Sequence, residues 1–355
     1  MLEIHFTNFY LHVLTTKDNV GNSSSRTYTI YIAKLKIGDY VKYEPDNNNS
    51  TYNLKAIYSG YDTDKIIDAS YDPTEWRIME IDENGNITKL FGVPNSNQSE
   101  VGFGNSIGYN NGVYLLNDIC KSRYGNASLG ATARNLNIED IESRMNATGI
   151  AAKNAYKFFS VQYGKTRKYT GNCTKYPALY EQEKYSGVHR DVQGNLVEVS
   201  DVEDGTQVIT ESADATAQAK MNPNGKTRSE ALYTTPTTET YRTDAINLTC
   251  TQTHYYFDST PSSYFDDTNF HSMIFGTGTN FWLASRFVGC SSYISYALFG
   301  LRYVYGNYLN CYHLFCSNGD SSSSNYRLAS VVSLGSGIQI KSGSGTESDP
   351  YVIGK

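Results

Sequence analysis

The sequence predicts an α+β fold with small antiparallel sheets, two flanking helices and long loops. The prediction rests on the order of the segments. Strand-like segments open the chain, two segments of helical spacing follow between residues 111 and 145, and strands return after a long irregular stretch. A chain of 355 residues suits one large or two medium domains. We divide it into an N-terminal extension at 1–33, a main domain at 34–340 and a Gly/Ser-rich tail at 341–355.

The composition limits the classes of function. The formal net charge is −6 and no basic cluster occurs, so nucleic acid is not an expected partner. The longest apolar runs are too short to cross a bilayer, which predicts no membrane insertion. Residues 1–16 lack the basic, apolar and small-residue parts of a signal peptide. The six cysteines form no CxxC pair, so buried free thiols are favoured, while a disulfide between Cys173 and Cys250 stays open.

Three strand regions are expected in the first hundred residues. Two strands at 11–14 and 27–32 flank an Asn/Gly turn, and 35–43 reads as a strand that enters the main domain. Alternation at 76–81 and 87–91 around the turn at 82–86 predicts a hairpin, with Trp76 in the core.

Two helices are expected next. Val113, Leu116, Ile119 and Cys120 recur at helical spacing within Asn111–Tyr124, and Gly125 is the stop signal. The second helix, 137–145, opens on Asn137 as N-cap and carries Glu139 and Asp140 in its first turn, where the helix dipole favours acids. We interpret 102–104 as a turn and expect a third, weaker helix at 153–163.

The irregular second half offers fewer signals. A strand is expected at 250–257, and the tail from 335 is either mobile or a final strand. Asp62 with Asp64, and Asp266 with Asp267, could bind Ca²⁺ through oxygens. Neither pair lies in a complete calcium-loop motif, so we interpret both as solvated turns and predict no metal site.

A stretch after Phe281 has an unusual composition. From Leu283 to Ile338 the chain has no Lys, Glu, Gln, Met or Trp, and Tyr, Ser, Asn, Gly and Cys dominate. One interpretation is a tyrosine-rich set of strands in a secreted domain. The other is a recognition surface, because Tyr gives large rigid contact area while Ser, Gly and Asn give adaptable hydrogen bonds.

The missing residue types also suggest how the stretch arose. Lys, Glu, Gln, Met and Trp are the residues that a codon ending in a pyrimidine cannot specify. Around Phe281–Arg286, Phe299–Arg302 and Arg327–Leu334 the chain resembles the variable proteins of diversity-generating retroelements, in their formylglycine-generating-enzyme-like subgroup. That family ends its variable region with Arg-Pro before Val-Val-Ser-Leu, whereas Ala329-Ser330 stands here. The hairpin at 11–32 resembles the last hairpin of a bacterial Ig-like repeat, and a plain N-terminal hairpin of the main domain is the alternative.

The resemblance implies a C-type-lectin fold that displays a variable region at about 283–334. It implies a hypervariable ligand-binding protein, extracellular on a bacterial cell or phage particle, whose partner is a cell-surface protein or glycan. The implied scaffold residues are Trp282, Arg286, Arg302 and Arg327. The implied contact residues are Phe287, Cys290, Ser291, Tyr293, Ser295, Tyr296, Tyr303, Tyr305, Asn307, Tyr308, Asn310, Tyr312, His313, Cys316, Asn318, Asp320, Ser322, Ser324 and Tyr326.

Two alternatives remain open from the residues. The first is a fixed-sequence bacterial surface adhesin or structural protein with invariant tyrosines. The second is an enzyme of the same fold that uses Cys311 and Cys316, although nothing in the sequence around them activates a thiol. No metalloprotease, nucleophile-elbow, phosphate-loop or dinucleotide motif occurs, so we expect no enzyme and no cofactor.

Overall fold

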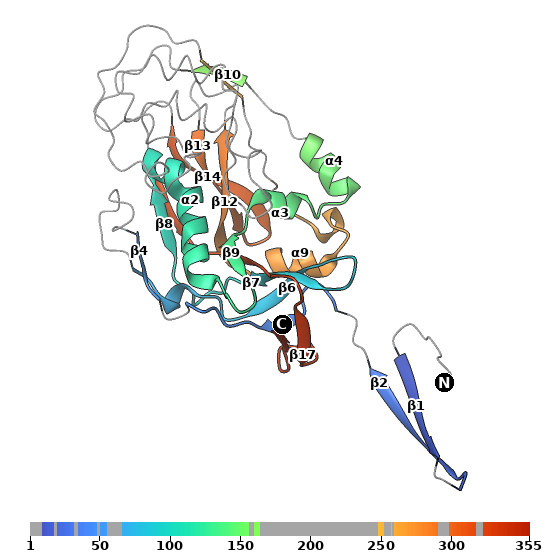
Figure 1. The fold of residues 1–355 in the computed structure, drawn as a ribbon. Helices are drawn as coiled ribbons and strands as arrows, with labels where there is room; N and C mark the ends of the chain where they lie inside the picture. The colour runs from blue at the N-terminus through green and yellow to red at the C-terminus, as the bar shows by residue number, and fades with distance from the viewer. Residues whose placement is uncertain are drawn as a thin grey trace.

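The chain adopts a mixed α+β fold in the computed structural model (Figure 1). The structure describes residues 9–17, 20–31, 35–47, 50–54, 66–155, 160–163, 248–251, 257, 259–289, 298–316 and 322–355. In Figure 1 the hairpin of β1 (Phe9–Lys17) and β2 (Ser23–Tyr31) stands apart from the main body, and it confirms the expected N-terminal pair of strands.

A seven-stranded sheet forms the base of the main body. Its order is β17 (Gln339–Ser342), β18 (Tyr351–Gly354), β3 (Tyr40–Lys42), β6 (Trp76–Ile81), β7 (Ile87–Gly92), β16 (Ser330–Ser333) and β9 (Thr132–Asn135). All neighbours are antiparallel except β18 and β3, which are parallel. The hairpin β6–β7 is confirmed. The tail forms the last two strands, so the boundary drawn at 340 falls inside β17 and the tail belongs to this sheet.

The main body also contains smaller sheets. The largest is antiparallel, in the order β12 (Asn280–Gly289), β13 (Leu298–Tyr305), β14 (Tyr308–Cys316). The pairs are β8 (Val101–Gly104) with β15 (Ser323–Tyr326), β4 (Tyr52–Asn53) with β5 (Ile66–Ile67), and β10 (Ser160–Tyr163) with β11 (Leu248–Thr251). Residues 102–104, expected to form a turn, therefore lie in β8.

Side-chain caps set where helices α3 and α4 begin. Helix α3 (Ile138–Glu142) is shorter than expected but starts as expected, because Asn137 and Asp140 form a reciprocal capping box. Helix α4 (Ala147–Ala155) starts after Asn146, whose Oδ1 accepts from the backbone N–H groups of Thr148 and Gly149. The prediction of a helix at 153–163 is wrong. Helix α4 ends at Ala155, and Ser160–Tyr163 form strand β10, in which Val161 and Tyr163 favour the extended conformation.

Helix α2 (Asn105–Tyr124) begins six residues before the expected start, directly after β8. It lies beside β12, β13 and β14 in Figure 1. Helix α9 (Thr268–Phe275) was not expected, and Asp267 is its N-cap, accepting from the N–H groups of Asn269 and Phe270. Two short 3₁₀ turns, η1 (Ala69–Tyr71) and η2 (Ser262–Tyr264), also occur.

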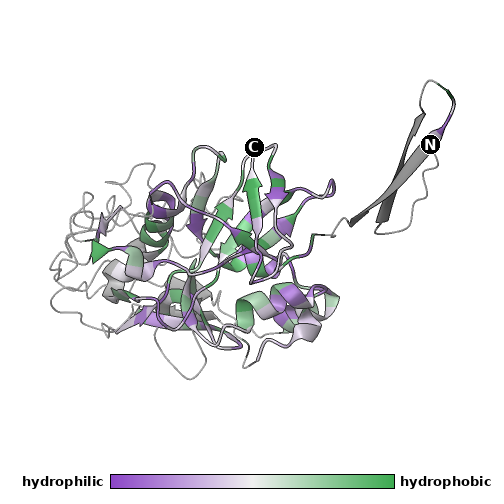
Figure 2. Cartoon of the chain, turned by 90° about the horizontal axis from the view of Figure 1, so that it is seen from below, coloured by the Kyte–Doolittle hydropathy of each residue, from purple (hydrophilic) through white to green (hydrophobic). Residues whose placement is uncertain are grey.

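Strand β12 separates two hydrophobic cores. Trp282 and Ala284 pack into the core around α2, whereas Phe281 and Leu283 pack into the core around α3 and α9. Successive side chains of a strand point to opposite faces, so the continuous apolar run of β12 reports burial on both faces. In Figure 2 the hydrophobic residues gather along the central strands of the main body.

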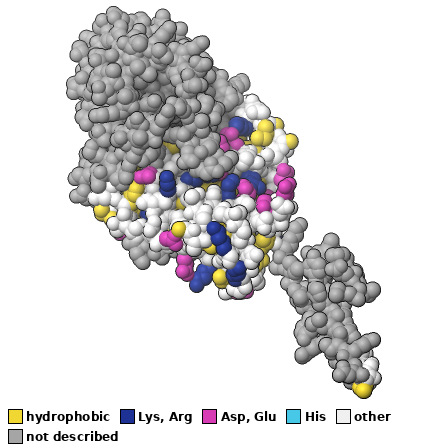
Figure 3. Space-filling model, in the orientation of Figure 1, with side chains coloured by type: hydrophobic (Ala, Val, Ile, Leu, Met, Phe, Trp, Pro, Cys, Tyr) yellow, Lys and Arg dark blue, Asp and Glu magenta, His cyan; other side chains and the backbone are white. Residues whose placement is uncertain are grey.

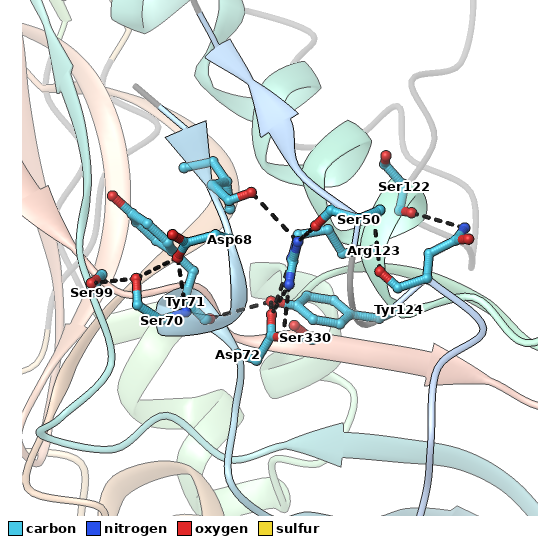
Figure 4. Close-up of polar contacts among 12 residues, drawn as sticks. Ser50, Asp68, Ser70, Tyr71, Asp72, Ser99, Ser122, Arg123, Tyr124 and Ser330 are labelled. Atoms are coloured by element: carbon cyan, nitrogen blue, oxygen red, sulfur yellow. Dashed lines mark hydrogen bonds and ion pairs between the residues drawn. The ribbon is translucent and has the colours of Figure 1, made fainter. Parts of the chain in front are cut away.

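A buried ion pair fastens the end of α2 to the surrounding chain (Figure 4). The Arg123 side chain is fully buried, and its Nε and Nη2 lie 2.7–3.0 Å from the Asp72 carboxylate. Arg123 Nη1 donates to the backbone carbonyl of Ser50, and the Tyr124 hydroxyl donates to Asp72 at 2.9 Å. Nearby, burial raises the pKa of Cys120 to about 12, so this thiol is a buried and unreactive one.

A second polar group joins β6 to its neighbours. The Glu80 carboxylate accepts from Lys89 Nζ at 2.9 Å, Arg144 Nη2 at 3.1 Å and Thr88 Oγ1 at 3.0 Å. Partial burial raises the pKa of Glu80, but the hydrogen bonds and charges of these partners outweigh it and hold the pKa below its usual value.

Candidate ligand-binding surface

Five tyrosines from three strands converge in the main body. We call Tyr303, Tyr305, Tyr308, Tyr312 and Tyr326 the tyrosine surface. The register of β13 with β14 places Tyr305 opposite Tyr308, and the two strands are joined by a tight turn at Gly306, whose φ of 57° favours glycine. Strand β15 brings Tyr326 against them, since it pairs with β8 and packs beside β12 and β14.

The rings form a connected stack on Trp282. The Trp282 and Tyr326 ring centroids are 4.5 Å apart and edge-on. Tyr326 lies parallel to Tyr303, with centroids 4.5 Å apart and planes 6° from parallel. Tyr305 continues from Tyr303 at 6.2 Å, and Tyr308 stacks on Tyr305 at 6.2 Å. Ring pairs at these spacings stabilise each other beyond their buried area.

The two ends of this stack differ in burial. Trp282 is 0% exposed and Tyr303 is 8% exposed, whereas Tyr308 is 37% and Tyr305 is 49% exposed. The inner rings are therefore fixed by the core, and the outer rings present aromatic area to solvent. Large exposed aromatic residues held in place by buried ones lose little conformational entropy when they bind.

Main-chain groups fix the inner end of the stack. Trp282 Nε1 donates to the Val101 carbonyl at 2.8 Å. The side chain of Asn135 donates to the Trp282 carbonyl at 2.8 Å and accepts from the Ala329 N–H at 3.0 Å, so it joins β12 to the start of β16. The Tyr312 hydroxyl donates to the Ser323 carbonyl at 3.1 Å, which ties β14 to β15.

The strands that carry the tyrosine surface offer no carboxylate and no exposed Lys or Arg. Burial, followed by neighbouring tyrosines, raises the pKa of Tyr303, and burial raises that of Tyr326. Residues 298–316 and 322–326 contain no Asp or Glu, and their one Arg, Arg302, is 4% exposed. On the face of the described main body seen in Figure 3, Lys and Arg lie among Asp and Glu. Contact area and hydrogen bonding, rather than charge, are what this surface offers.

Polar side chains from the predicted set surround the rings. Asn307, in the β13–β14 turn, and His313 are exposed, and the His313 ring stacks on Tyr312 with centroids 5.7 Å apart. Asn310 is half-buried on β14. Ser322 and Ser324 are half-buried, and Ser322 Oγ donates to the His313 carbonyl at 2.6 Å.

Two predicted contact residues are buried instead. Phe287 is 3% exposed and lies against Gly300, where an added Cβ would come within 2.5 Å of the Phe287 ring. Tyr303 is covered by Tyr326 and supports the outer rings. The remaining predicted positions, Cys290, Ser291, Tyr293, Ser295, Tyr296, Asn318 and Asp320, lie outside the described residues, and for Arg286 and Cys316 only the backbone is described.

The scaffold residues hold the strands together. Arg327 Nη1 lies 2.9 Å from the Glu100 carboxylate, and its Nη2 donates to the Ser96 carbonyl at 3.1 Å. Arg302 is buried, with Nη1 3.8 Å from the Sγ atom of Cys311 on the paired strand. Ala329 and Ser330, where the resemblance leads one to expect Arg-Pro, are 0% and 1% exposed small side chains.

Sequence reasoning missed the support from β8. Gly102 and Gly104 let β15 approach closely, because an added Cβ would lie 2.2 Å from Asn325 Oδ1 and 2.9 Å from Ser323 Cβ. Glycine inside a strand is a signal of close backbone approach, and the alternating Gly-Phe-Gly could have shown it. Nothing local in the sequence marks Asn135, whose partners are distant along the chain.

Comparison of the chain with known proteins found no relative. No protein-family model, curated protein or solved structure matches the chain. None of the helices among the described residues is long and apolar enough to span a membrane.

Proposed function

We propose that the chain is a non-enzymatic binding protein whose tyrosine surface recognises a cell-surface protein or glycan. The proposed scaffold is C-type-lectin-like, and the proposed setting is extracellular, on a bacterial cell or a phage particle. The stretch at about 283–334 is proposed to be diversified, as the resemblance to variable proteins of diversity-generating retroelements implies.

The observation that carries the proposal is the graded burial of the aromatic stack. A structural stack would end in buried rings, but this one ends in Tyr305 and Tyr308, which are the large aromatic side chains most exposed in the described chain. Tyrosines dominate binding hot spots because they combine apolar area with a hydroxyl. Asn307, Asn310 and His313 add polar groups beside these rings.

The same gradient predicts which positions can vary. Exchange of an outer residue alters only what the surface presents, whereas exchange of a buried residue leaves a cavity in the core. We therefore expect diversification at Tyr305, Asn307, Tyr308, Asn310 and His313, and constancy at Trp282, Leu301 and Val304.

The first test is on DNA. The region around the gene is sequenced and searched for a near-copy of the codons for Phe281–Leu334. The proposal expects a copy that differs from the gene only where the copy carries adenine, with the differences at the exposed positions. Absence of a copy, together with an invariant segment across cells, would refute diversification.

A second test measures recognition itself. The purified chain is applied to an array of bacterial surface glycans and outer-surface proteins, and the strongest ligand is titrated against the Tyr305→Ala/Tyr308→Ala double variant. We expect binding at least about tenfold weaker, because a hot-spot side chain contributes about 2 kcal/mol or more. The matched control is Tyr264→Ala, which removes a half-buried tyrosine from η2, outside the tyrosine surface. Equal loss in both variants would contradict the assignment.

The fixed-sequence adhesin remains the second candidate. The burial of Tyr303 and Phe287 favours it, because these residues serve packing rather than display. It predicts an invariant segment and a single ligand that still depends on Tyr305 and Tyr308.

A further inference from the structure

A polar pocket lies away from the tyrosine surface, between the base sheet and α9. Its volume is about 330 Å³, at the lower end of the range of about 300–1,000 Å³ that small-molecule sites occupy. Its walls come from the start of β6, the segment after β7 and the C-terminal end of α9, which lie side by side in Figure 1.

Hydrogen bonds fix these walls in place. The Asn95 side chain donates to Thr74 Oγ1 at 3.4 Å, and the Pro94 carbonyl accepts from Thr279 Oγ1 at 3.2 Å. The Ser96 carbonyl accepts from Arg327, which the Glu100 carboxylate holds. A pocket with fixed walls needs little ordering when a ligand enters.

The charges of the pocket favour a neutral ligand. Its lining contains one acid and one base, Glu75 and Arg77, and these pair with each other at 2.9 Å. The Arg77 guanidinium is further held 4.1 Å above the Tyr40 ring. An anion would meet Glu75 and the negative end of the α9 dipole, and a cation would meet Arg77.

The remaining groups suit hydroxyl recognition. Among the described contacts, the hydroxyls of Ser96 and Ser272 have no protein partner, and both line the pocket. Glu75 accepts while Arg77 and Asn95 donate, so adjacent hydroxyls of one ligand can each find a partner. Val93 and Met273 also line the pocket, but they are 8% and 1% exposed, so the wall is mainly polar.

We propose that this pocket binds a neutral polyhydroxylated ligand of monosaccharide size. The pocket is independent of the tyrosine surface, so the chain has two separate binding sites. This inference does not rest on the proposed function, because none of its residues belongs to the tyrosine surface or to the stretch at 283–334.

The test uses the full chain and saturation-transfer difference NMR. The probes are the methyl α-pyranosides of glucose, mannose and galactose, with alanine as a zwitterion and methyl phosphate, whose methyl protons report saturation transfer, as an anion. We expect saturation transfer to at least one hexoside and none to alanine or methyl phosphate. Transfer to no hexoside, or to alanine or methyl phosphate instead, would overturn the assignment.

Variants then locate the ligand. Ser272→Gln and, separately, Ser96→Gln extend a longer side chain into the pocket from a helix and from a loop, so one of them suffices if the other misfolds. Each is expected to weaken hexoside binding about tenfold, the effect of losing one or two hydrogen bonds. Ser262→Gln, the same exchange at an exposed serine of η2 outside both proposed sites, is the control and should leave hexoside binding unchanged. Loss in Tyr308→Ala with retention in both pocket variants would place the sugar on the tyrosine surface and refute the pocket.

Discussion

The hydrogen bond from Trp282 to β8 is the contact whose loss can be predicted most sharply. Replacing Trp282 with Phe keeps an aromatic ring but removes Nε1, which donates to the Val101 carbonyl at 2.8 Å. Val101 is 0% exposed, so water cannot replace the lost donor. An unsatisfied buried carbonyl costs about 1–3 kcal/mol, and the smaller ring costs about 1–2 kcal/mol in packing.

The chain contains a matched control for this change. The sequence has two tryptophans, and Trp76 is also buried and packed between rings, but no hydrogen bond from its indole to a described residue is found. Trp76→Phe should therefore lose only the packing part, about 1–2 kcal/mol. The difference between the two variants estimates the Trp282 hydrogen bond.

The assay is urea unfolding followed by far-UV circular dichroism. Each variant keeps one tryptophan, so the fluorescence of the remaining indole gives a second, local signal from the same core. We expect Trp282→Phe to shift the midpoint further than Trp76→Phe, with equal slopes. Equal shifts would show that the indole hydrogen bond adds nothing, and would refute the account of how the aromatic stack is anchored.

Three further predictions concern polar groups of the main body. Asp72→Ala leaves the Arg123 charge buried without its carboxylate and should lower the unfolding free energy, measured in urea melts, by about 3–5 kcal/mol. The double variant Asp72→Leu/Arg123→Met removes both charges and should recover part of this loss. No recovery would contradict the buried-charge explanation. Because the folded pKa of Glu80 is depressed, its stabilisation is present above the unfolded pKa of about 4.3 and is lost as pH falls through the folded value. The melting temperature of Glu80→Gln should therefore depend less on pH below about 5 than that of the parent protein. Parallel curves of melting temperature against pH would contradict the role given to Glu80. Asp267→Ala removes the N-cap of α9 and should cost about 1 kcal/mol, checked against Asp267→Asn, which keeps a capping oxygen and should cost less.

Local signals in the sequence predicted part of the fold. The turn chemistry between β6 and β7 and the Asn137 cap of α3 act within a few residues, so both were predictable. Helix α9 carries the same kind of signal at Asp267, but it is only eight residues long and its cap was interpreted as a solvated turn. Strand β8 was missed because its partner β15 lies more than 200 residues away in the chain.

The candidate site was likewise predicted only in part. Composition alone identified the tyrosines that meet on β13, β14 and β15. It could not rank them, because Tyr303 and Tyr305 share one face of β13 and differ only in what other strands place over them. Tyr303 is covered by Tyr326, whose position depends on the pairing of β15 with β8. When strands that are distant in the sequence decide whether a side chain is buried, the neighbouring residues carry no pattern that predicts its burial.

The parallel pairing of β3 with β18 affects how the main body would carry a mechanical load. Val41 pairs with Tyr351 and Lys42 with Val352, so the strand that enters the main body and the strand at its C-terminal end lie side by side and run in the same direction. Tension between residue 35 and residue 355 pulls these two strands in opposite senses along their length. Their hydrogen bonds run across the strands, so this tension shears them together rather than opening them one at a time. Extension of the main body between residues 35 and 355 therefore requires the paired residues of β3 and β18 to separate at the same time.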